Sequence, residues 1–202
     1  AGLWADRLAK RSGARPTARI VPFRGEYWSL RDGRSSLVRG LIYPVPDPRF
    51  PFLGVHLTKT LDGGVHCGPN AVLTWRRDGY RRGAFALGDA LDTLRWPGFW
   101  KMAARHARTG LAESWRAWSH HHFAAALRRL VPDVRDDDLV PAEPGIRAQA
   151  LERDGSLVDD FRFEREGRVL HVLNAPSPAA TAALVIAEEL LERAHDDGLL
   201  SM

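Results

Sequence analysis

The sequence has a single cysteine, Cys67, and no apolar run that approaches the roughly 20 residues a helix needs to cross a bilayer. A lone cysteine excludes an internal disulfide and fits a reducing compartment, where Cys67 is most simply a small strand residue. The opening residues, AGLWADRLAK, have neither the basic start nor the apolar stretch of a signal peptide. These absences argue against a secreted or membrane-spanning protein.

Lysine is also scarce. Of the 29 basic residues only Lys10, Lys59 and Lys101 are lysine, so 26 are arginine, and the formal net charge is +4. The arginines are scattered among 25 acidic residues, and the basic residues at 128–129 are followed closely by the aspartates at 136–138. A nucleic-acid surface needs clustered positive charge. We therefore predict no nucleic-acid partner, and keep a non-catalytic basic binding module as an alternative.

What is present is typical of a folded domain. With 202 residues, of which 45% are hydrophobic and 27% charged, the chain is long enough to bury a core. The first residue is not methionine, and the opening is already amphipathic rather than a polar tail. We therefore expect that residues are missing before Ala1.

The spacing of apolar residues changes several times along the chain, from helical to alternating and back. The expected elements are a helix over 3–12, strands over 19–31 and 37–45, a hairpin around 62–64, helices between 87 and 131, a hairpin around 153–156, a buried strand over 168–174 and a final helix. Strands, then helices, then strands and a helix predict an α+β fold with a domain crossing near residue 140.

The first hairpin allows a prediction of which side chains share a face. A three-residue loop at 62–64 places His56 opposite Asn70 and Thr60 opposite His66, so that one face is wholly polar. The other face is apolar apart from Lys59 and carries Val55, Leu57, Cys67 and Pro69. Two histidines and an asparagine are unusual at water-facing positions, although a solvated outer face is the simpler alternative.

The final helix is preceded by Ser177, a good N-cap, and Pro178, which suits the first helical position. The residues that follow, AATAAL, are almost all small. Bare backbone N–H groups and the positive end of the helix dipole would then face a planar or anionic group. Close packing of the helix on a sheet is the alternative explanation for the alanines.

Four segments in order resemble the FAD-dependent L-2-hydroxyglutarate oxidase and dehydrogenase family, a branch of the D-amino-acid-oxidase-like flavoproteins. They are RIVPFRGEYW, LVRGLIYPVPDPRFPFLGVHLTKTLDGGVHCGPNAVL, GIRAQALERDGSLVDDF and HVLNAPSPAATAAL. The resemblance covers essentially the whole chain. NAPSPAAT replaces the glycine-rich turn of the wider superfamily, and Ala148 replaces the proline of its GxRP motif. Both departures favour the hydroxyglutarate branch over the amine oxidases.

The resemblance also indicates what this chain lacks. Enzymes of this kind begin with a Rossmann strand and a GxGxxG turn, and the sequence contains neither. The chain therefore resembles the carboxyl-terminal half of a longer enzyme. Residues 1–18 and 141–202 would belong to the FAD-binding domain, and residues 19–140 would form an antiparallel or mixed-sheet substrate domain with helices.

The reaction implied by the family is oxidation of (S)-2-hydroxyglutarate to 2-oxoglutarate, with hydride transfer to flavin and loss of the hydroxyl proton to a base. The implied cofactor contacts are Gly2, Asn174, Pro176, Ser177, Pro178, Ala179 and Thr181. Arg147 matches the arginine that binds the substrate anion, and a guanidinium suits a carboxylate bidentately. A surface ion pair is the alternative for Arg147.

Other roles are less constrained. His56 and His66 are both candidates for the base, and Tyr43 and Asn70 for substrate contacts, although each could instead satisfy a structural hydrogen bond. The histidines at 120–122 lack a partnered carboxylate or an i, i+4 pair, so no metal site is predicted. His171 is expected in packing or an interior hydrogen bond.

The resemblance implies a small dicarboxylate substrate and the missing amino-terminal half as partners, in the cytoplasm, with peripheral inner-membrane or quinone contact left open. Another 2-hydroxy acid or glycerol phosphate is the alternative substrate.

Overall fold

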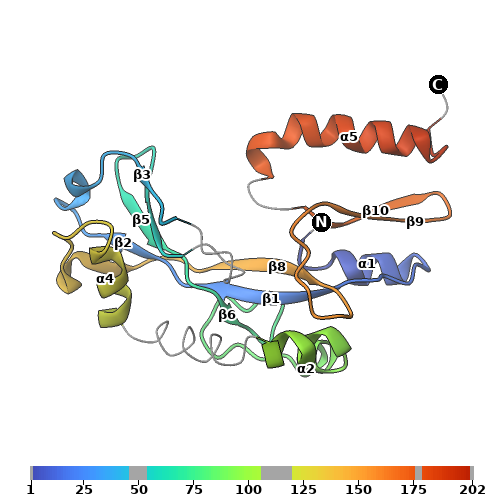
Figure 1. Cartoon of the computed structure of the whole chain (residues 1–202), viewed down its shortest axis with the longest axis horizontal. Coiled ribbons are helices and arrows are strands. Elements are labelled where there is room, and N and C mark those ends of the chain that lie inside the picture. Colours follow the sequence, from blue (N-terminus) through green and yellow to red (C-terminus); the bar gives the residue numbers. More distant parts are fainter. Residues whose placement is uncertain (1, 46–53, 106–119, 176–178, 201–202) are drawn as a thin grey trace. The chain divides into compact units, whose positions relative to one another are not determined.

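The computed structural model describes residues 2–45, 54–105, 120–175 and 179–200, and its elements are drawn in Figure 1. The chain forms two compact units. Unit 1 contains Ala1–Val21, Asp92–Lys101 and Ala148–Met202, and unit 2 contains Pro22–Leu91 and Met102–Arg147. The boundaries fall inside β1 (Arg19–Gly25), α2 (Leu87–Leu94) and β8 (Gly145–Leu151).

Unit 2 is built on a five-stranded sheet with the order β3-β4-β5-β2-β7, in which all pairings are antiparallel. Its strands are β2 (Trp28–Leu30), β3 (Leu41–Ile42), β4 (His56–Lys59), β5 (Val65–Gly68) and β7 (Leu139–Pro141). A second sheet has the order β6-β1-β8, with β6 at Val72–Leu73. The short helices η1 (Ser35–Leu37) and η2 (Asp136–Asp138) lie in the connections.

The core of unit 2 lies between the five-stranded sheet and α4 (His120–Arg128). Leu57 and Cys67 from the β4–β5 hairpin are fully buried there. From α4, Phe123 and Leu127 join the same cluster, and their four-residue spacing places them on one face of the helix. The apolar face predicted for the hairpin is therefore the core face, which confirms the assignment of faces.

The predicted register of this hairpin is wrong by two residues. His56 pairs with Gly68 rather than Asn70, and Thr58 pairs with His66. The loop has three residues as predicted but lies at 61–63, because the N–H of Thr60 donates to the carbonyl of Gly64 at 3.0 Å. A three-residue hairpin loop needs a left-handed residue at its last position, and Gly63 adopts φ +87° there. A shift of two leaves every side chain on its predicted face.

Two predicted strands are shorter than expected. The run over 19–31 is divided into β1 and β2, because β1 pairs with β6 whereas β2 pairs with β5 and β7 in the other sheet. The run over 37–45 contains only β3, preceded by η1. The helices expected between 87 and 131 are confirmed at α2, at residues 97–105 and at α4, while residues 106–119 lie outside the described part.

Unit 1 contains α1 (Ala5–Arg11), the antiparallel hairpin of β9 (Arg162–Glu166) and β10 (Val169–Asn174), and α5 (Ala183–Asp196) after a single turn, η3 (Ala180–Ala182). The buried side chains of Ala5 and Ala9 on α1 pack against Leu173 of β10. Alanine on the contact face of α1 allows the helix to approach the strand closely.

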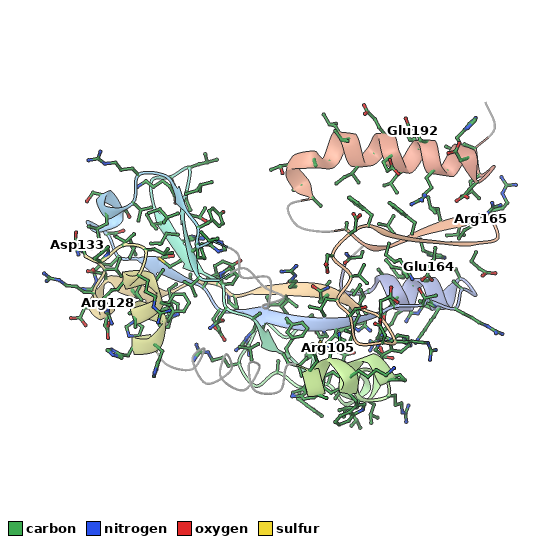
Figure 2. The ribbon with its side chains drawn as sticks, viewed as in Figure 1. Arg105, Arg128, Asp133, Glu164, Arg165 and Glu192 are labelled. Atoms are coloured by element: carbon green, nitrogen blue, oxygen red, sulfur yellow. The ribbon has the colours of Figure 1, made fainter. Side chains whose placement is uncertain are left out.

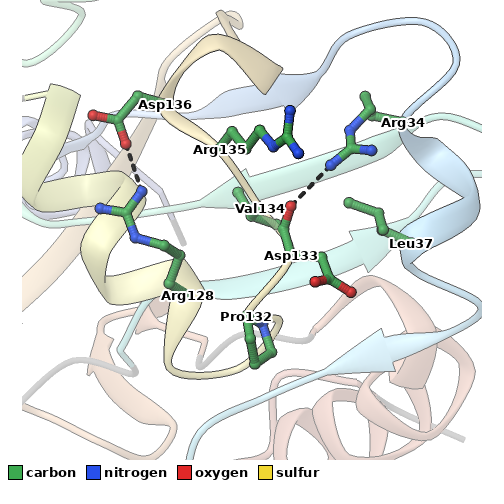
Figure 3. Close-up of a pocket in the computed structure, with 8 residues that line it drawn as sticks. All are labelled: Arg34, Leu37, Arg128, Pro132, Asp133, Val134, Arg135 and Asp136. Carbon is green, nitrogen blue, oxygen red and sulfur yellow. Dashed lines mark hydrogen bonds and ion pairs between the residues drawn. The ribbon is translucent and has the colours of Figure 1, made fainter.

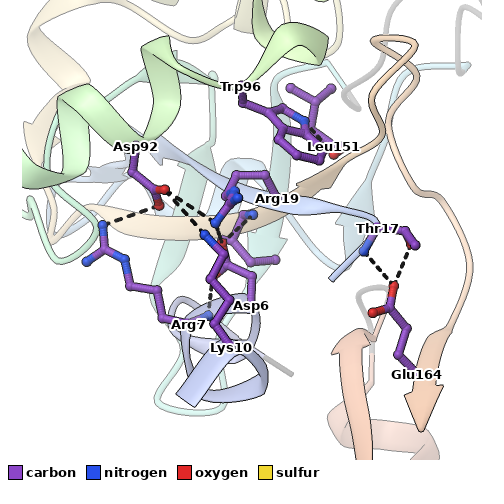
Figure 4. Close-up of polar contacts among 10 residues, drawn as sticks. Asp6, Arg7, Lys10, Thr17, Arg19, Asp92, Trp96, Leu151 and Glu164 are labelled. Atoms are coloured by element: carbon purple, nitrogen blue, oxygen red, sulfur yellow. Dashed lines mark hydrogen bonds and ion pairs between the residues drawn. The ribbon is translucent and has the colours of Figure 1, made fainter. Parts of the chain in front are cut away.

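A network of buried charges holds α1, β1 and α2 of unit 1 together (Figure 4). Asp6 is fully buried and accepts the backbone N–H of Ile20 at 3.2 Å. The guanidinium of Arg19 lies 3.3 Å from a carboxylate oxygen of Asp92 and 3.7 Å from one of Asp6. A buried carboxylate is stable only when such partners are present, so removal of one partner would be costly.

Trp96 extends the same network. Its ring lies 5.0 Å from the guanidinium carbon of Arg19, and its indole N–H donates to the carbonyl of Leu151 at 3.0 Å. An indole buried in this way needs a hydrogen-bond acceptor, which the end of β8 supplies. The arrangement fixes the segment after α2 against β1 and β8.

Two predictions for the end of the chain are wrong. The strand over 168–174 is not in a sheet interior: β10 pairs with β9 in a two-stranded sheet, and Val169 is 44% exposed. The last α-helix begins at Ala183 rather than directly after Ser177, which lies outside the described residues. The residues just before Ala183 form the 3₁₀ turn η3, so α-helical hydrogen bonding begins only after this turn.

The backbone comes very close to Gly98, which provides a test of the packing in unit 1. A Cβ atom added at Gly98 would lie 1.8 Å from the carbonyl oxygen of Glu152, so Gly98→Ala requires a backbone shift. We expect the free energy of unfolding to fall by about 1–3 kcal/mol, measured by urea unfolding. The matched control is Gly88→Ala on α2, where an added Cβ meets nothing within 4 Å. Equal stability of the two variants would contradict this packing.

The buried thiol provides a second test. Burial raises the pKa of Cys67 to about 12. Such a thiol holds about a thousandfold less thiolate at neutral pH than an exposed cysteine. We expect the native chain to react with a disulfide reagent at least about a hundredfold more slowly than the chain in denaturant. Rapid labelling of the native chain, with no change in its circular dichroism, would contradict the burial of Cys67.

Candidate active site

Two of the predicted site residues of unit 2 stack directly on each other. The rings of Tyr43 and His56 have centroids 4.5 Å apart and an interplanar angle of 23°. Burial, and to a lesser extent the nearby Tyr43, raise the pKa of the Tyr27 hydroxyl. The polar face of the hairpin is therefore covered in part by the ring of Tyr43, at the position of His56.

His56 is held in one tautomer. Its Nδ1 atom lies 3.1 Å from the carbonyl oxygen of Gly54. A carbonyl can only accept a hydrogen bond, so Nδ1 carries the proton and Nε2 keeps its lone pair. A neutral imidazole arranged in this way can accept a proton at Nε2.

His66 is on the same face but in different surroundings. It is exposed and pairs with Thr58, nearer the loop of the hairpin. The pKa of Asp62 in that loop is lowered, first by the hydrogen bond from the Thr60 hydroxyl and also by the nearby His66. The structure therefore brings His56 together with Tyr43 and places His66 beside the loop.

Asn70 has a fixed orientation and an available donor. Its Oδ1 atom accepts the backbone N–H of Glu26 at 3.0 Å. Within the described residues its Nδ2 atom has no hydrogen-bond partner. Gly68, two residues earlier, has φ +137°, and a Cβ added there would lie 2.8 Å from the carbonyl oxygen of Glu26. Residues 68–70 therefore lie directly against the backbone of residues 26–27.

The sequence analysis missed a buried charged cluster beside Asn70. Arg24 and Glu26 are only 8% and 9% exposed, and the guanidinium of Arg24 pairs with the Glu26 carboxylate. Arg82 pairs with the same carboxylate oxygen, at 3.3 Å. A signal was present in the sequence, since Arg24 and Glu26 are two apart in the mostly apolar segment RIVPFRGEYW, which was predicted as part of one strand. Residues two apart in a strand share a face.

Arg147 lies on β8 and is exposed. Its role as a substrate contact stays a prediction, and the alternative of a surface ion pair stays open. It belongs to unit 2, as do His56, Tyr43 and Asn70.

The predicted cofactor contacts all belong to unit 1. Gly2 is exposed with φ +109°, and an added Cβ there would meet nothing within 4 Å. Asn174 is buried, and its Nδ2 donates to the carbonyls of Val158 at 3.2 Å and Asp160 at 2.8 Å. Its amide nitrogen is therefore engaged in holding the chain.

The start of the last helix is exposed. Ala180, Thr181 and Ala182 have exposed side chains, and η3 has no side-chain cap. Pro176, Ser177 and Pro178 lie outside the described residues. Close packing on a sheet therefore does not explain the alanines of η3 in the described part of the chain.

A separate cavity of about 470 Å³ lies in unit 2 and contains none of the predicted site residues (Figure 3). Two of its three arginines, Arg34 and Arg128, are paired with aspartates. The Nη1 atom of Arg128 lies 2.5 Å from Oδ1 of Asp136, and the Nε atom of Arg34 lies 2.9 Å from Oδ1 of Asp138. The pKa of Asp138 is lowered because hydrogen bonds from Arg135 and Arg34 outweigh the opposing effect of burial. A cavity with paired charges is a poor anion site.

Charged side chains are distributed over both units, as the labelled Arg128 and Asp133 of unit 2 and Glu164, Arg165 and Glu192 of unit 1 illustrate (Figure 2). Among the described residues no three His, Cys, Asp or Glu side chains could together hold a metal ion. In the histidine trio, the ring centroid of His120 lies 4.6 Å from that of Trp28. The Nδ1 atom of His121 lies 2.6 Å from Oδ2 of Asp136.

His171 is half-buried, and its Nε2 lies 2.8 Å from the Ser12 hydroxyl, so its hydrogen bond is not an interior one. No helix in the described ranges is both long and apolar enough to span a bilayer.

The chain is similar to proteins named L-2-hydroxyglutarate dehydrogenase. The protein from Indibacter alkaliphilus is 46% identical over 193 residues, covering 95% of this chain and 48% of that protein. The mitochondrial protein from Homo sapiens is 44% identical over 202 residues, covering 96% of this chain and 44% of that protein. The protein from Escherichia coli K12 is 44% identical over 192 residues, covering 95% of this chain and 46% of that protein.

The chain thus spans about half the length of the curated relatives it matches. The match to the family described as FAD dependent oxidoreductase extends over residues 1–193, and so includes both units. On this basis the chain belongs to the FAD dependent oxidoreductase family.

Proposed function

We propose that this chain is the carboxyl-terminal half of an FAD-dependent enzyme that oxidises (S)-2-hydroxyglutarate to 2-oxoglutarate. The observation that carries the proposal is the similarity to L-2-hydroxyglutarate dehydrogenases along both units. An upstream half would supply the dinucleotide-binding turn that this sequence lacks.

The start of the last helix fits one part of a flavin site. The side chains from Ala179 to Ala182 are small, and those of Ala180, Thr181 and Ala182 are exposed, which leaves room for a flat ring at the turn η3. Gly2 likewise leaves open space. These residues, with Asn174 and residues 176–178, would hold the cofactor together with the upstream half. FAD, when bound, accepts the hydride from the α-carbon of the substrate.

His56 is the proposed base. As hydride leaves the α-carbon, the substrate hydroxyl must lose its proton, and Nε2 of His56 has the lone pair to accept it. The Gly54 carbonyl stabilises the imidazolium that forms, because it accepts the hydrogen bond from Nδ1. Stacking against Tyr43 fixes the plane of the ring. Among the described residues, no backbone carbonyl and no aromatic ring contacts His66 in this way.

The remaining unit 2 residues would orient the substrate. Arg147 would bind a carboxylate bidentately. Asn70 could donate from Nδ2 because its Oδ1 is fixed by Glu26, and Tyr43 would offer its hydroxyl beside His56. By resemblance we also propose a cytoplasmic enzyme. Contact with the inner membrane or with a quinone is left open, as is oxygen as the electron acceptor.

The experiment that tests the function uses the full-length enzyme under anaerobic conditions. (S)-2-hydroxyglutarate should bleach the flavin absorbance faster than other 2-hydroxy acids or glycerol 3-phosphate. Faster bleaching by one of those compounds would transfer the proposal to that substrate. A full-length protein that binds no FAD and is retained on a polyanion in a salt-dependent manner would favour the basic binding module.

The choice of base can be tested by comparing His56→Gln with His66→Gln in the full-length enzyme. We expect His56→Gln to lower kcat by about 10²–10⁴-fold, because proton transfer loses its acceptor. His66→Gln should change kcat by less than about threefold, as expected for a residue outside the reaction. Steady-state kinetics with 2-hydroxyglutarate would compare the two variants with the wild-type enzyme. The opposite ranking would assign the base to His66.

The substrate arginine can be tested with Arg147→Met. We expect kcat/KM for 2-hydroxyglutarate to fall at least about tenfold, because a charged hydrogen bond to a carboxylate contributes about 1.5–3 kcal/mol. Arg168→Met, in the exposed β9–β10 turn, is the control and should leave the kinetics unchanged. Wild-type kinetics for Arg147→Met would remove Arg147 from the site.

A further inference from the structure

The cluster of Arg24, Glu26 and Arg82 has one more positive than negative charge. Arg24 is 8% exposed and pairs with Glu26 Oε1, and Arg82 Nε forms an ion pair with the same oxygen at 3.3 Å. One carboxylate is therefore shared by two guanidinium groups. The buried pair of Arg24 and Glu26 is neutral by itself, and the additional positive charge is on Arg82, whose side chain is 51% exposed and can meet an incoming anion.

Arg24 has donors that the described residues do not satisfy. A guanidinium has five N–H groups, and within the described part of the chain Arg24 makes a single side-chain interaction, with Glu26. None of its nitrogens is among the fully buried atoms that lack a partner, in contrast to Nε and Nη1 of Arg19. The unused donors of Arg24 therefore remain accessible to a group that enters from outside.

The cluster lies next to one of the proposed substrate residues, Asn70. The backbone N–H of Glu26 donates to Oδ1 of Asn70 at 3.0 Å. The arginines Arg34 and Arg128 in the cavity of unit 2 differ from this cluster, because each of them is paired with a separate aspartate and neither shares a carboxylate.

We propose that Arg24 and Arg82, held in place by Glu26, bind the second carboxylate of a dicarboxylate substrate. This inference rests on the proposed function, in which Arg147 binds one carboxylate and a five-carbon diacid carries another. Two guanidinium groups around Glu26 form a charge-matched site once a second carboxylate enters. A substrate that lacks this group would leave the excess cation unpaired, so the cluster determines specificity for diacids.

The test compares Arg82→Met with Arg81→Met in the full-length FAD-loaded enzyme. Arg82 is about half exposed, so its removal should leave the fold intact, and Arg81 is an exposed neighbour outside the cluster. The substrates are 2-hydroxyglutarate and 2-hydroxypentanoate, which has the same chain length and one carboxylate. We expect Arg82→Met to lower kcat/KM at least tenfold for the diacid and less than twofold for the monoacid. Arg81→Met should change neither.

A second measurement separates this inference from the proposed reaction. Glutarate contains both carboxylates and no hydroxyl, and its dissociation constant can be measured by titration calorimetry without turnover. We expect a rise of at least tenfold in Arg82→Met and in Arg24→Gln, and none in Arg81→Met. An unchanged glutarate affinity in Arg82→Met, or an equal loss for both 2-hydroxy acids, would overturn the assignment of the cluster. Failure of the wild-type enzyme to oxidise 2-hydroxyglutarate would instead overturn the proposed function.

Discussion

The candidate active site depends on a buried carboxylate, that of Glu26. A carboxylate at 9% exposure must be paired, and it is paired with Arg24 and Arg82 from different parts of unit 2. Its backbone N–H fixes the side chain of Asn70, and its carbonyl oxygen lies so close to residue 68 that only glycine fits there. One residue therefore connects β1, the end of β5 and the loop that carries Arg82.

Unit 1 depends on the same kind of constraint. Asp6 is fully buried, with Arg19 and the backbone of Ile20 as partners, and Arg19 reaches Asp92 as well. In both units an arginine of β1, either Arg19 or Arg24, is the charged residue that neutralises a buried acid. The two arginines differ, since Nε and Nη1 of Arg19 are fully buried without a hydrogen-bond partner, whereas no nitrogen of Arg24 is among such atoms in the described residues. We infer that the first is structural and that the second is available to a ligand.

The periodicity of the sequence predicted the faces of the β4–β5 hairpin but not its register. Alternation alone decides which side chains face the core, so Leu57 and Cys67 were predicted correctly. The register depends on which residue takes the left-handed position, and DGG offers two glycines for it. Gly63 takes that position, supported by the hydrogen bond between the Thr60 hydroxyl and Asp62. Local pattern could not choose between two equivalent glycines.

The sequence by itself determined the α+β class, the core face of the hairpin and, through its motifs, the family. It also placed His56 and His66 on one face, because that follows from a period of two. Only the tertiary structure selected His56, since the Tyr43 ring that stacks on it comes from the segment after β3, and the local contact of its Nδ1 with the Gly54 carbonyl depends on the folded backbone. The Glu26 cluster was likewise decided in three dimensions. Arg24 and Glu26 are close in the sequence, but the pairing of Arg82 with Glu26 depends on a chain reversal that no local spacing encodes.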